Sequence, residues 1–112
     1  MVDRRAHEIC MLVSREAKAA LQEKLDGVYL FGSYARGDFD EESDIDIFVR
    51  IACAPSQLAQ YREMFCPLAS RLSLAYGVTV SVCVADKQSF DRYKNALAFY
   101  RNIEKEGVAI AG

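Results

Sequence analysis

Four residues in the first half of the chain have the types and the spacing for chemistry on a phosphate group. Gly32 and Ser33 are followed, after ten intervening residues, by Asp44 and Asp46. A glycine lets the backbone approach a ligand closely, and the free N–H groups of a turn form an anion site together with a serine hydroxyl. Carboxylate oxygens combined with substrate phosphate oxygens are the ligands that Mg²⁺ prefers. The pattern therefore indicates metal-assisted phosphoryl or nucleotidyl transfer.

Two short strands are predicted to hold these residues in place. Residues 28–31 form an apolar and aromatic run that predicts a buried strand ending at the Gly-Ser pair. A helical turn over residues 34–36 and a polar loop over residues 37–43 are expected to follow. Residues 44–49 alternate polar and apolar and then become fully apolar, which is typical of a strand. The two aspartates then point to the same face, with Cα atoms about 6.5 Å apart, and can reach one metal cluster.

At these residues the sequence resembles the DNA polymerase beta-type nucleotidyltransferase superfamily, whose signature is Gly-Ser, ten residues, then Asp-x-Asp. The short length and residues 31–38 are most similar to the minimal nucleotidyltransferases, an antitoxin-like group of small prokaryotic proteins related to kanamycin nucleotidyltransferase. Many of these are encoded beside a HEPN-domain protein in toxin–antitoxin pairs. The resemblance covers residues 28–49 strongly and the rest only in the order of its elements. It implies an α/β (α+β) fold in which a small mixed sheet packs against helices, as in the polymerase beta palm.

The resemblance also implies a role for each matching residue. Gly32 and Ser33 would hold a nucleoside triphosphate, and ATP is the triphosphate expected first. Asp44 and Asp46 would be the catalytic residues and the ligands of two Mg²⁺ ions. The implied reaction moves a nucleoside monophosphate to a hydroxyl acceptor such as one on a HEPN-domain partner. Arg36 follows the Gly-Ser turn closely enough to bind a phosphate through its planar fork. A solvent-facing arginine without a ligand is the alternative interpretation of that residue.

The sequence departs from the superfamily at the third carboxylate that its enzymes usually carry on a neighbouring strand. The candidate strand, residues 78–84, alternates valines on one face with Thr79, Ser81 and Cys83 on the other. The valine face is expected to be buried, so the other face should share its side of the sheet with the two aspartates. Ser81 or Thr79 therefore stands where the acid is expected, and neither hydroxyl can act as a charged ligand or as a base near neutral pH.

This departure leaves two functions open. Asp86 after the strand, Glu41 or Glu42 from the loop, or an acid from a partner chain could replace the third carboxylate. A site with two aspartates can also retain slow activity, because phosphoryl transfer depends mostly on positioning and electrostatic stabilisation. The alternative is a degenerate module that binds a nucleotide or a toxin without turnover. A calcium-binding loop is disfavoured because the acids lack the spacing of an EF-hand.

Composition and length narrow the choice of partners. The chain has 112 residues, 52% of them hydrophobic, which predicts a single domain over residues 1–112. A second substrate domain does not fit, so a homodimer mate or another protein is expected to supply the acceptor-binding surface. The net charge of −2 gives no basic footprint for nucleic acid. Four cysteines without Cys-x-x-Cys spacing, no signal peptide and no apolar run of about 18 residues predict a cytoplasmic protein without a membrane partner.

The remaining elements are predicted more coarsely. Residues 3–25 have apolar positions at helical spacing and are expected to pack on the back of the sheet. A second helix is predicted over residues 56–75, with a kink or break near Phe65 caused by Pro67. An interrupted helix is predicted over residues 86–106. Its aromatic stripe is either core or a docking surface, and the last five residues are expected to add an edge strand or to fray.

Overall fold

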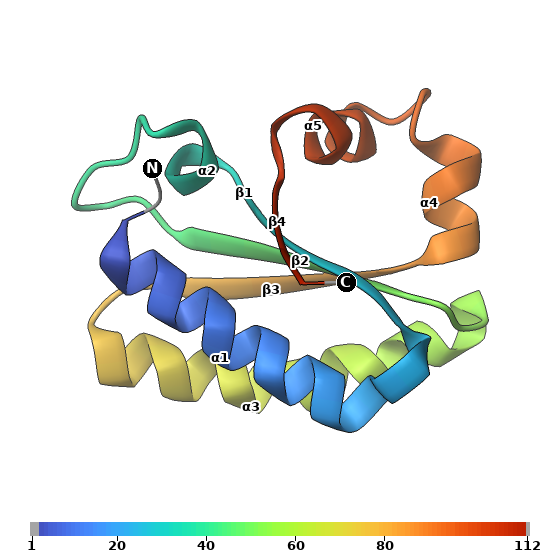
Figure 1. The fold of residues 1–112 in the computed structure, drawn as a ribbon, viewed down its shortest axis with the longest axis horizontal. Coiled ribbons are helices and arrows are strands. Elements are labelled where there is room, and N and C mark those ends of the chain that lie inside the picture. Colours follow the sequence, from blue (N-terminus) through green and yellow to red (C-terminus); the bar gives the residue numbers. More distant parts are fainter. Residues whose placement is uncertain (1–2, 112) are drawn as a thin grey trace.

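The computed structural model describes residues 3–111 and has a four-stranded mixed sheet at its centre (Figure 1). The strands are β1 (Leu25–Phe31), β2 (Ile45–Ile51), β3 (Val80–Asp86) and β4 (Val108–Ala111), arranged in the order β3-β2-β1-β4. β1 is antiparallel to both β2 and β4, whereas β2 and β3 are parallel. The small mixed sheet expected from the sequence is confirmed.

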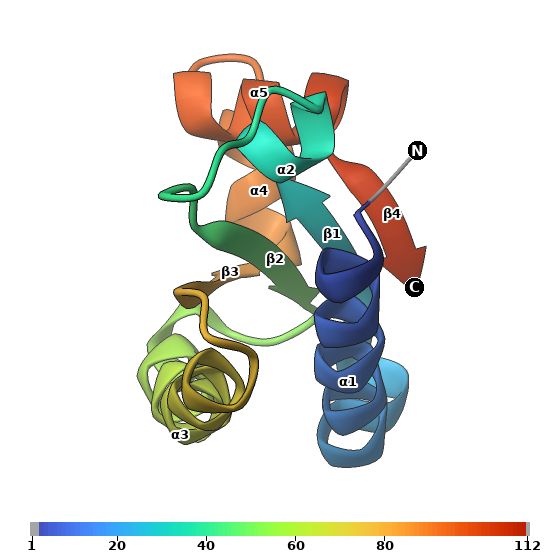
Figure 2. The same ribbon diagram turned by 90° about the vertical axis from the view of Figure 1, so that its left-hand side faces the viewer.

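Helices lie on both faces of this sheet. The two long helices, α1 (Arg4–Leu21) and α3 (Leu58–Tyr76), cover one face. The opposite face carries the short helices α2 (Ser33–Arg36), α4 (Lys87–Tyr93) and α5 (Ala98–Glu106), as the end-on view in Figure 2 shows. Short 3₁₀ turns at Gln22–Lys24 and Pro55–Gln57 follow α1 and precede α3. Among the described residues, no helix is long and apolar enough to cross a membrane.

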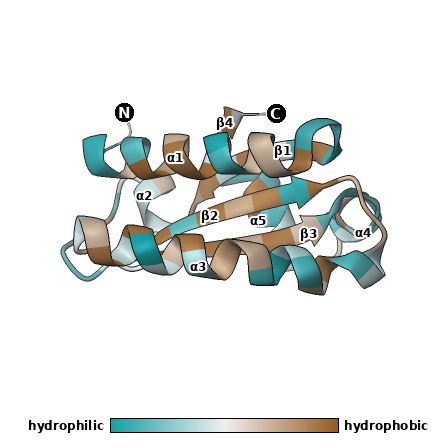
Figure 3. Cartoon of the chain, turned by 90° about the horizontal axis from the view of Figure 1, so that it is seen from below, coloured by the Kyte–Doolittle hydropathy of each residue, from teal (hydrophilic) through white to brown (hydrophobic). Residues whose placement is uncertain are grey.

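Burial is divided between two hydrophobic clusters, one on each face of the sheet. The larger cluster fills the space between the sheet and the pair α1 and α3, and Figure 3 shows much of β2 and β3 in hydrophobic colours behind these helices. From β2, the larger cluster includes the odd-numbered residues Ile45, Ile47 and Val49. The smaller cluster contains Phe48 and lies against α4 and α5. Because side chains alternate along a strand, Asp46 shares the face of Phe48 rather than the face of the main core.

One predicted helix boundary is wrong, and tertiary packing explains it. The first helix ends at Leu21 rather than at residue 25, because Leu25 pairs with Ile51 and so belongs to the sheet. Of the kink or break predicted near Phe65, the break does not occur, since α3 continues through Pro67 as one helix. Its buried side chains lie both before and after the proline, so packing against the sheet holds the two halves together: Tyr61, Phe65, Leu68 and Leu72.

The C-terminal third matches its prediction more closely. The interrupted helix is confirmed as α4 and α5, and the chain then adds β4 as an edge strand beside β1. Phe90 and Ile103 are buried, whereas 44% of Tyr93 and 48% of Leu97 are exposed. The aromatic stripe is therefore partly core and partly surface. Gly112 lies outside the described residues.

Asp86 has a structural role at the junction of β3 and α4. It is 2% exposed, and its Oδ2 accepts a hydrogen bond of 2.8 Å from the backbone N–H of Ser89, which makes it the N-cap of α4. Asp86 pairs with Ile51, whereas Ser81 pairs with Asp46 five residues earlier on the same two strands. This places Asp86 about 16 Å along the strands from the aspartate pair. It cannot serve as the third carboxylate of that site.

The cap predicts a specific pattern of stability changes at this position. We expect Asp86→Ala to lower the free energy of unfolding by about 1–2 kcal/mol, because the N–H of Ser89 loses its acceptor. Asp86→Asn should retain most of the stability, since its amide oxygen can accept the same bond. Urea unfolding of the three proteins measures both effects. Equal losses in the two variants would show that the cap is not what Asp86 contributes.

Candidate functional site

The site begins where β1 ends, at a glycine for which no other residue can be substituted without strain. Gly32 has a φ of 76°, a region that side chains other than glycine rarely adopt. A Cβ at this position would lie 2.7 Å from Oδ2 of Asp46. The backbone of Gly32 therefore lies directly against the Asp46 carboxylate, and both the dihedral angle and the available space require glycine here.

The turn that follows Gly32 is the predicted helical turn, α2. The carbonyl of Gly32 accepts hydrogen bonds of 3.1 Å from the N–H groups of Ala35 and Arg36. The carbonyl of Ser33 accepts from Gly37 at 2.9 Å, and Gly37 ends the turn in the left-handed conformation. The first N–H groups of a helix have no acceptor within the helix. The N–H of Ser33 therefore remains free of the helical ladder on the side of the turn where the chain leaves β1.

Tyr34 anchors this turn to the rest of the protein. The residue is buried, and its ring stacks on that of Phe39 with a centroid distance of 4.2 Å. Its hydroxyl accepts a hydrogen bond of 3.1 Å from Arg5 of α1. These contacts fix α2 from both sides, so the Gly-Ser turn is held rigidly relative to the sheet.

Asp44 and Asp46 approach the same point from the start of β2. Asp46 is opposite Phe31 in the β1–β2 pairing, which places it next to Gly32, and Asp44 is an exposed residue just before the strand. Burial raises the pKa of Asp46 above its ordinary value, and the charge of Asp44 raises it further. The structure thus brings together the Gly-Ser turn and both aspartates, as the sequence predicted.

Arg36 lies at the margin of this group. Its Nε donates a hydrogen bond of 3.2 Å to Asp38, and its Nη1 is 3.6 Å from Glu106 at the end of α5. The positive charge of Arg36 lowers the pKa of Asp46, so the guanidinium acts on the site electrostatically. Its carboxylate partners are exposed, and ion pairs of this kind contribute little stability. A phosphate could replace them at small cost.

Ser81 occupies the position nearest to Asp46 on the neighbouring strand. The two residues are partners in the parallel β2–β3 pairing, while Thr79 precedes β3 and its carbonyl accepts a bond of 2.8 Å from the N–H of Ile45. Between the two hydroxyl residues that the sequence left open, the register selects Ser81. Within residues 3–111 there is no group of three His, Cys, Asp or Glu side chains that could hold a metal ion.

Sequence reasoning missed two features of this region. Glu106 reaches Arg36 from α5, and a hollow of about 390 Å³ beside Asp44 is lined in part by Glu41, Glu42 and Thr79. Neither leaves a local signal, because each depends on segments that are far apart in the chain. Glu41 and Glu42 are exposed at the rim of the site.

The nucleotidyltransferase domain model matches residues 14–110, and the chain therefore belongs to the nucleotidyltransferase domain family. This confirms the resemblance and the enzyme class inferred from the sequence. The Methanocaldococcus jannaschii protein named "Putative protein adenylyltransferase MJ0141" is 34% identical over 105 residues, which cover 92% of this chain and 96% of that protein.

Solved structures support the same fold. A chain of a toxin–antitoxin complex crystallised with AMP-PNP superposes with a TM-score of 0.57 at 22% identity, covering 98% of this chain and 74% of the other. A chain from a complex of a tri-AMPylated Shewanella oneidensis HEPN toxin with an MNT antitoxin gives a TM-score of 0.50 at 22% identity, covering 95% and 72%. At these identities the likeness shows the fold alone.

The contact between Gly32 and Asp46 predicts a severe effect of a single methyl group. We expect Gly32→Ala to lower the thermal unfolding midpoint and to abolish any ligand binding at the turn, because the Cβ would displace the Asp46 carboxylate. Gly37→Ala is the matched control, since it also has a positive φ of 87° but a Cβ there would meet nothing within 4 Å. Equal behaviour of the two variants in ligand binding would contradict the steric argument.

The raised pKa of Asp46 predicts that its ionised carboxylate lowers the stability of the metal-free protein. The folded state binds this proton more tightly than the unfolded state, so the penalty is absent well below the ordinary value of 3.8 and complete above the raised pKa. Asp46→Asn should therefore unfold a few degrees higher than the wild type at pH 7 in EDTA. The difference should vanish near pH 3. A variant that is less stable than the wild type at pH 7 would contradict this assignment.

Proposed function

We propose that the protein transfers AMP from magnesium-bound ATP to a hydroxyl group on a partner protein, and that the partner is a HEPN-domain protein. The observation that carries this proposal is the contact of the Gly32 backbone with the Asp46 carboxylate, because a phosphate bound at the turn would then be next to a metal ion bound by the acid. Family membership supplies the class of reaction. The choice of AMP and of a protein acceptor rests on the relatives.

Three similar proteins support that choice. The similar Methanocaldococcus jannaschii protein is named as a protein adenylyltransferase. Of the structural neighbours, one was crystallised with AMP-PNP, an ATP analogue, and another contains a HEPN toxin that carries AMP groups. These properties belong to the relatives. They are consistent with an ATP donor site in the present chain and with an acceptor hydroxyl on another protein.

The residues fit Mg²⁺ as the implied metal. Asp46 lies in β2 and Asp44 just before it, and burial, followed by the charge of Asp44, raises the pKa of Asp46. A divalent cation between the two carboxylates would relieve their repulsion. Both would hold the metal together with phosphate oxygens of the substrate. When bound, Mg²⁺ would neutralise charge on the phosphates and on the leaving pyrophosphate.

The chain's own residues then bind and orient the two substrates. The N–H groups and hydroxyl at Ser33, together with Arg36, would hold the distal phosphates, so that the α-phosphorus faces the aspartates. The acceptor oxygen forms a bond to this phosphorus while the bond to the pyrophosphate oxygen, on the opposite side, breaks. Ser81 cannot accept the proton of the attacking hydroxyl near neutral pH, so this proton passes to solvent water. Rate enhancement therefore depends on positioning and electrostatics.

A second function is favoured by one observation. Ser81 lies in register with Asp46, and residues 3–111 offer no three-carboxylate metal site. A protein that binds its toxin partner, with or without nucleotide, and performs no transfer is compatible with that arrangement. The two functions differ in whether label from the α-phosphate of ATP becomes attached to the partner.

The proposed function predicts metal-dependent binding of ATP and its loss in one conservative variant. We expect MgATP to raise the thermal unfolding midpoint, because a ligand that binds only the folded state stabilises it by mass action. ATP in EDTA should have a smaller effect, and Asp44→Asn should abolish the magnesium-dependent part. With a purified HEPN-domain toxin as acceptor, α-labelled ATP should label the toxin with the wild type only. Binding without labelling would favour the second function, and full activity of Asp44→Asn would remove the metal-site assignment.

A further inference from the structure

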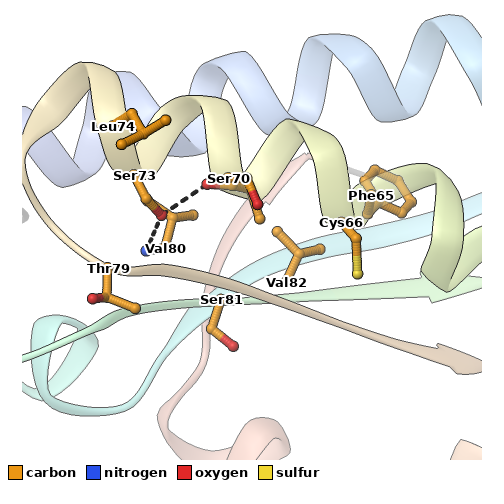
Figure 4. A pocket seen from close by; sticks show the side chains of 10 residues that line it. Phe65, Cys66, Ser70, Ser73, Leu74, Thr79, Val80, Ser81 and Val82 are labelled. Atoms are coloured by element: carbon orange, nitrogen blue, oxygen red, sulfur yellow. Dashed lines mark hydrogen bonds between the residues drawn. The ribbon is translucent and has the colours of Figure 1, made fainter.

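A groove runs between α3 and the open edge of β3, next to the proposed site. β3 is the outermost strand on its side of the sheet. The hollow between strand and helix has a volume of about 620 Å³ and is bounded by residues 79–82 of β3 and its approach, with Cys66, Ser70, Ser73 and Leu74 from α3 (Figure 4). Its walls are mostly small side chains, and Leu74 is 88% exposed at its rim. We call this feature the α3–β3 groove.

The groove continues into the proposed site. The second hollow, of about 390 Å³, shares Ser73, Leu74 and Thr79 with the first and reaches Asp44 at its other end. Together the two hollows lead from the α3 face of the sheet, around the start of β3, to one of the proposed metal ligands. A molecule lying in the groove would therefore have one end at the reaction centre.

The backbone of β3 is suited to pairing with an extended chain. The carbonyl of Thr79 bonds to β2, so by alternation Val80 and Val82 direct their backbone groups outward. The outward N–H of Val80 already donates to the Ser73 hydroxyl at 2.9 Å, so an added strand would pair with the carbonyl of Val80 and the backbone groups of Val82. An added strand would lie about 4.8 Å from β3, and protein edges of this kind commonly bind extended segments.

Ser81 leaves the path from this edge to Asp46 open. Figure 4 shows Thr79 and Ser81 pointing away from α3, while Val80 and Val82 point to the helix. Ser81 is in register with Asp46 and therefore lies on the same face of the sheet as that residue. A segment paired with β3 would lie two strand spacings, about 10 Å, from β2. A side chain of that segment must cross Ser81 to reach the metal site. The small hydroxyl permits this crossing, which a third carboxylate with its bound metal would obstruct.

The charge of the groove's inner end indicates what chemistry it binds. Glu41, Glu42 and Asp44 are all exposed there, and α3 ends beside them at Gly77. The C-terminus of a helix carries a partial negative charge, which adds to that of Glu41 and Glu42, the two carboxylates here that are not proposed metal ligands. A segment with basic residues next to its acceptor hydroxyl would complement this end of the groove.

We propose that the α3–β3 groove docks an extended, basic segment of the acceptor protein and delivers its hydroxyl across Ser81 to Asp44 and Asp46. This inference rests on the proposed function, which supplies the reaction and the acceptor. It assigns a surface and a partner chemistry that neither the family nor its site residues specify. The donor nucleotide is bound from the other side, at the Gly-Ser turn.

Cys66 allows the groove to be blocked chemically. It is exposed and points into the space between α3 and β3, whereas Cys10 is buried with its pKa raised to about 12. Burial also raises the pKa of Cys53 and Cys83, which slows their alkylation. A bulky maleimide should therefore react first at Cys66. The Cys66→Ser variant, treated in the same way, controls for reaction elsewhere.

We expect the labelled wild type to transfer AMP to the HEPN-domain toxin about tenfold more slowly or worse, because the acceptor is no longer positioned. The thermal shift with MgATP should be unchanged, and Cys66→Ser should be insensitive to the reagent. In unlabelled protein, reversing the charge at Glu41 and Glu42 to lysine should raise KM for the toxin several-fold and change kcat by less than about twofold. Glu63→Lys, at an exposed acid of α3 that does not line the groove, should leave both constants unchanged.

Three results would overturn the inference. Transfer at an unchanged rate by the labelled protein would show that the acceptor binds elsewhere. A change in oligomeric state on labelling, measured by light scattering, would assign the groove to a second copy of the chain. A fall in kcat with unchanged KM in the Glu41 and Glu42 variant would make those residues part of the metal site. Absence of transfer and of any MgATP shift in the unlabelled wild type would instead be a failure of the proposed function.

Discussion

The whole site depends on the close contact between the Gly32 backbone and the Asp46 carboxylate. The antiparallel pairing of Phe31 with Asp46 brings the last residue of one strand beside the second residue of the next. With no Cβ in the way, the turn can then pass over the carboxylate. A phosphate bound at the turn and a cation bound at the acid would consequently be neighbours. The strands provide this proximity before any ligand binds, so the ligand does not have to produce it.

The same contact has an energetic cost that the fold must offset. Asp46 is half-buried next to another acid, and burial is the larger cause of its raised pKa. The stabilising contributions come from the other face of β2, where Ile45, Ile47 and Val49 are fully buried against α1 and α3. Alternation along one strand thus separates the side chains that stabilise the fold from the side chain proposed to bind the metal. A group held at such a cost is typical of a functional site rather than of a surface loop.

The sequence was sufficient to predict this local arrangement because its determinants are local. The Gly-Ser turn, the ten-residue spacing and the alternation through Asp46 lie within one hairpin-like unit, and the parity of β3 correctly placed its hydroxyl residues on the site's face. The errors came from longer-range contacts. Leu25 joins the sheet because Ile51 is available as a partner, and α3 tolerates Pro67 because its buried face is continuous. Ile51 and the sheet residues that pack against α3 both lie outside the short stretch of sequence over which periodicity is judged.

Ser81 is involved both in the absence of the third carboxylate and in the access from the open edge of β3. In register with Asp46, a carboxylate at this position would add a metal ligand and would also close the face between the edge of β3 and the aspartates. Under the proposed function, the serine supplies no such ligand and leaves that face accessible from the α3–β3 groove. A site that binds a small acceptor gains nothing from such an opening, since the acceptor can arrive from solvent. A site that receives a side chain still attached to a folded protein needs an unobstructed path along which the segment can lie. The lost ligand and the open edge are therefore consistent with one requirement, access for a macromolecular acceptor.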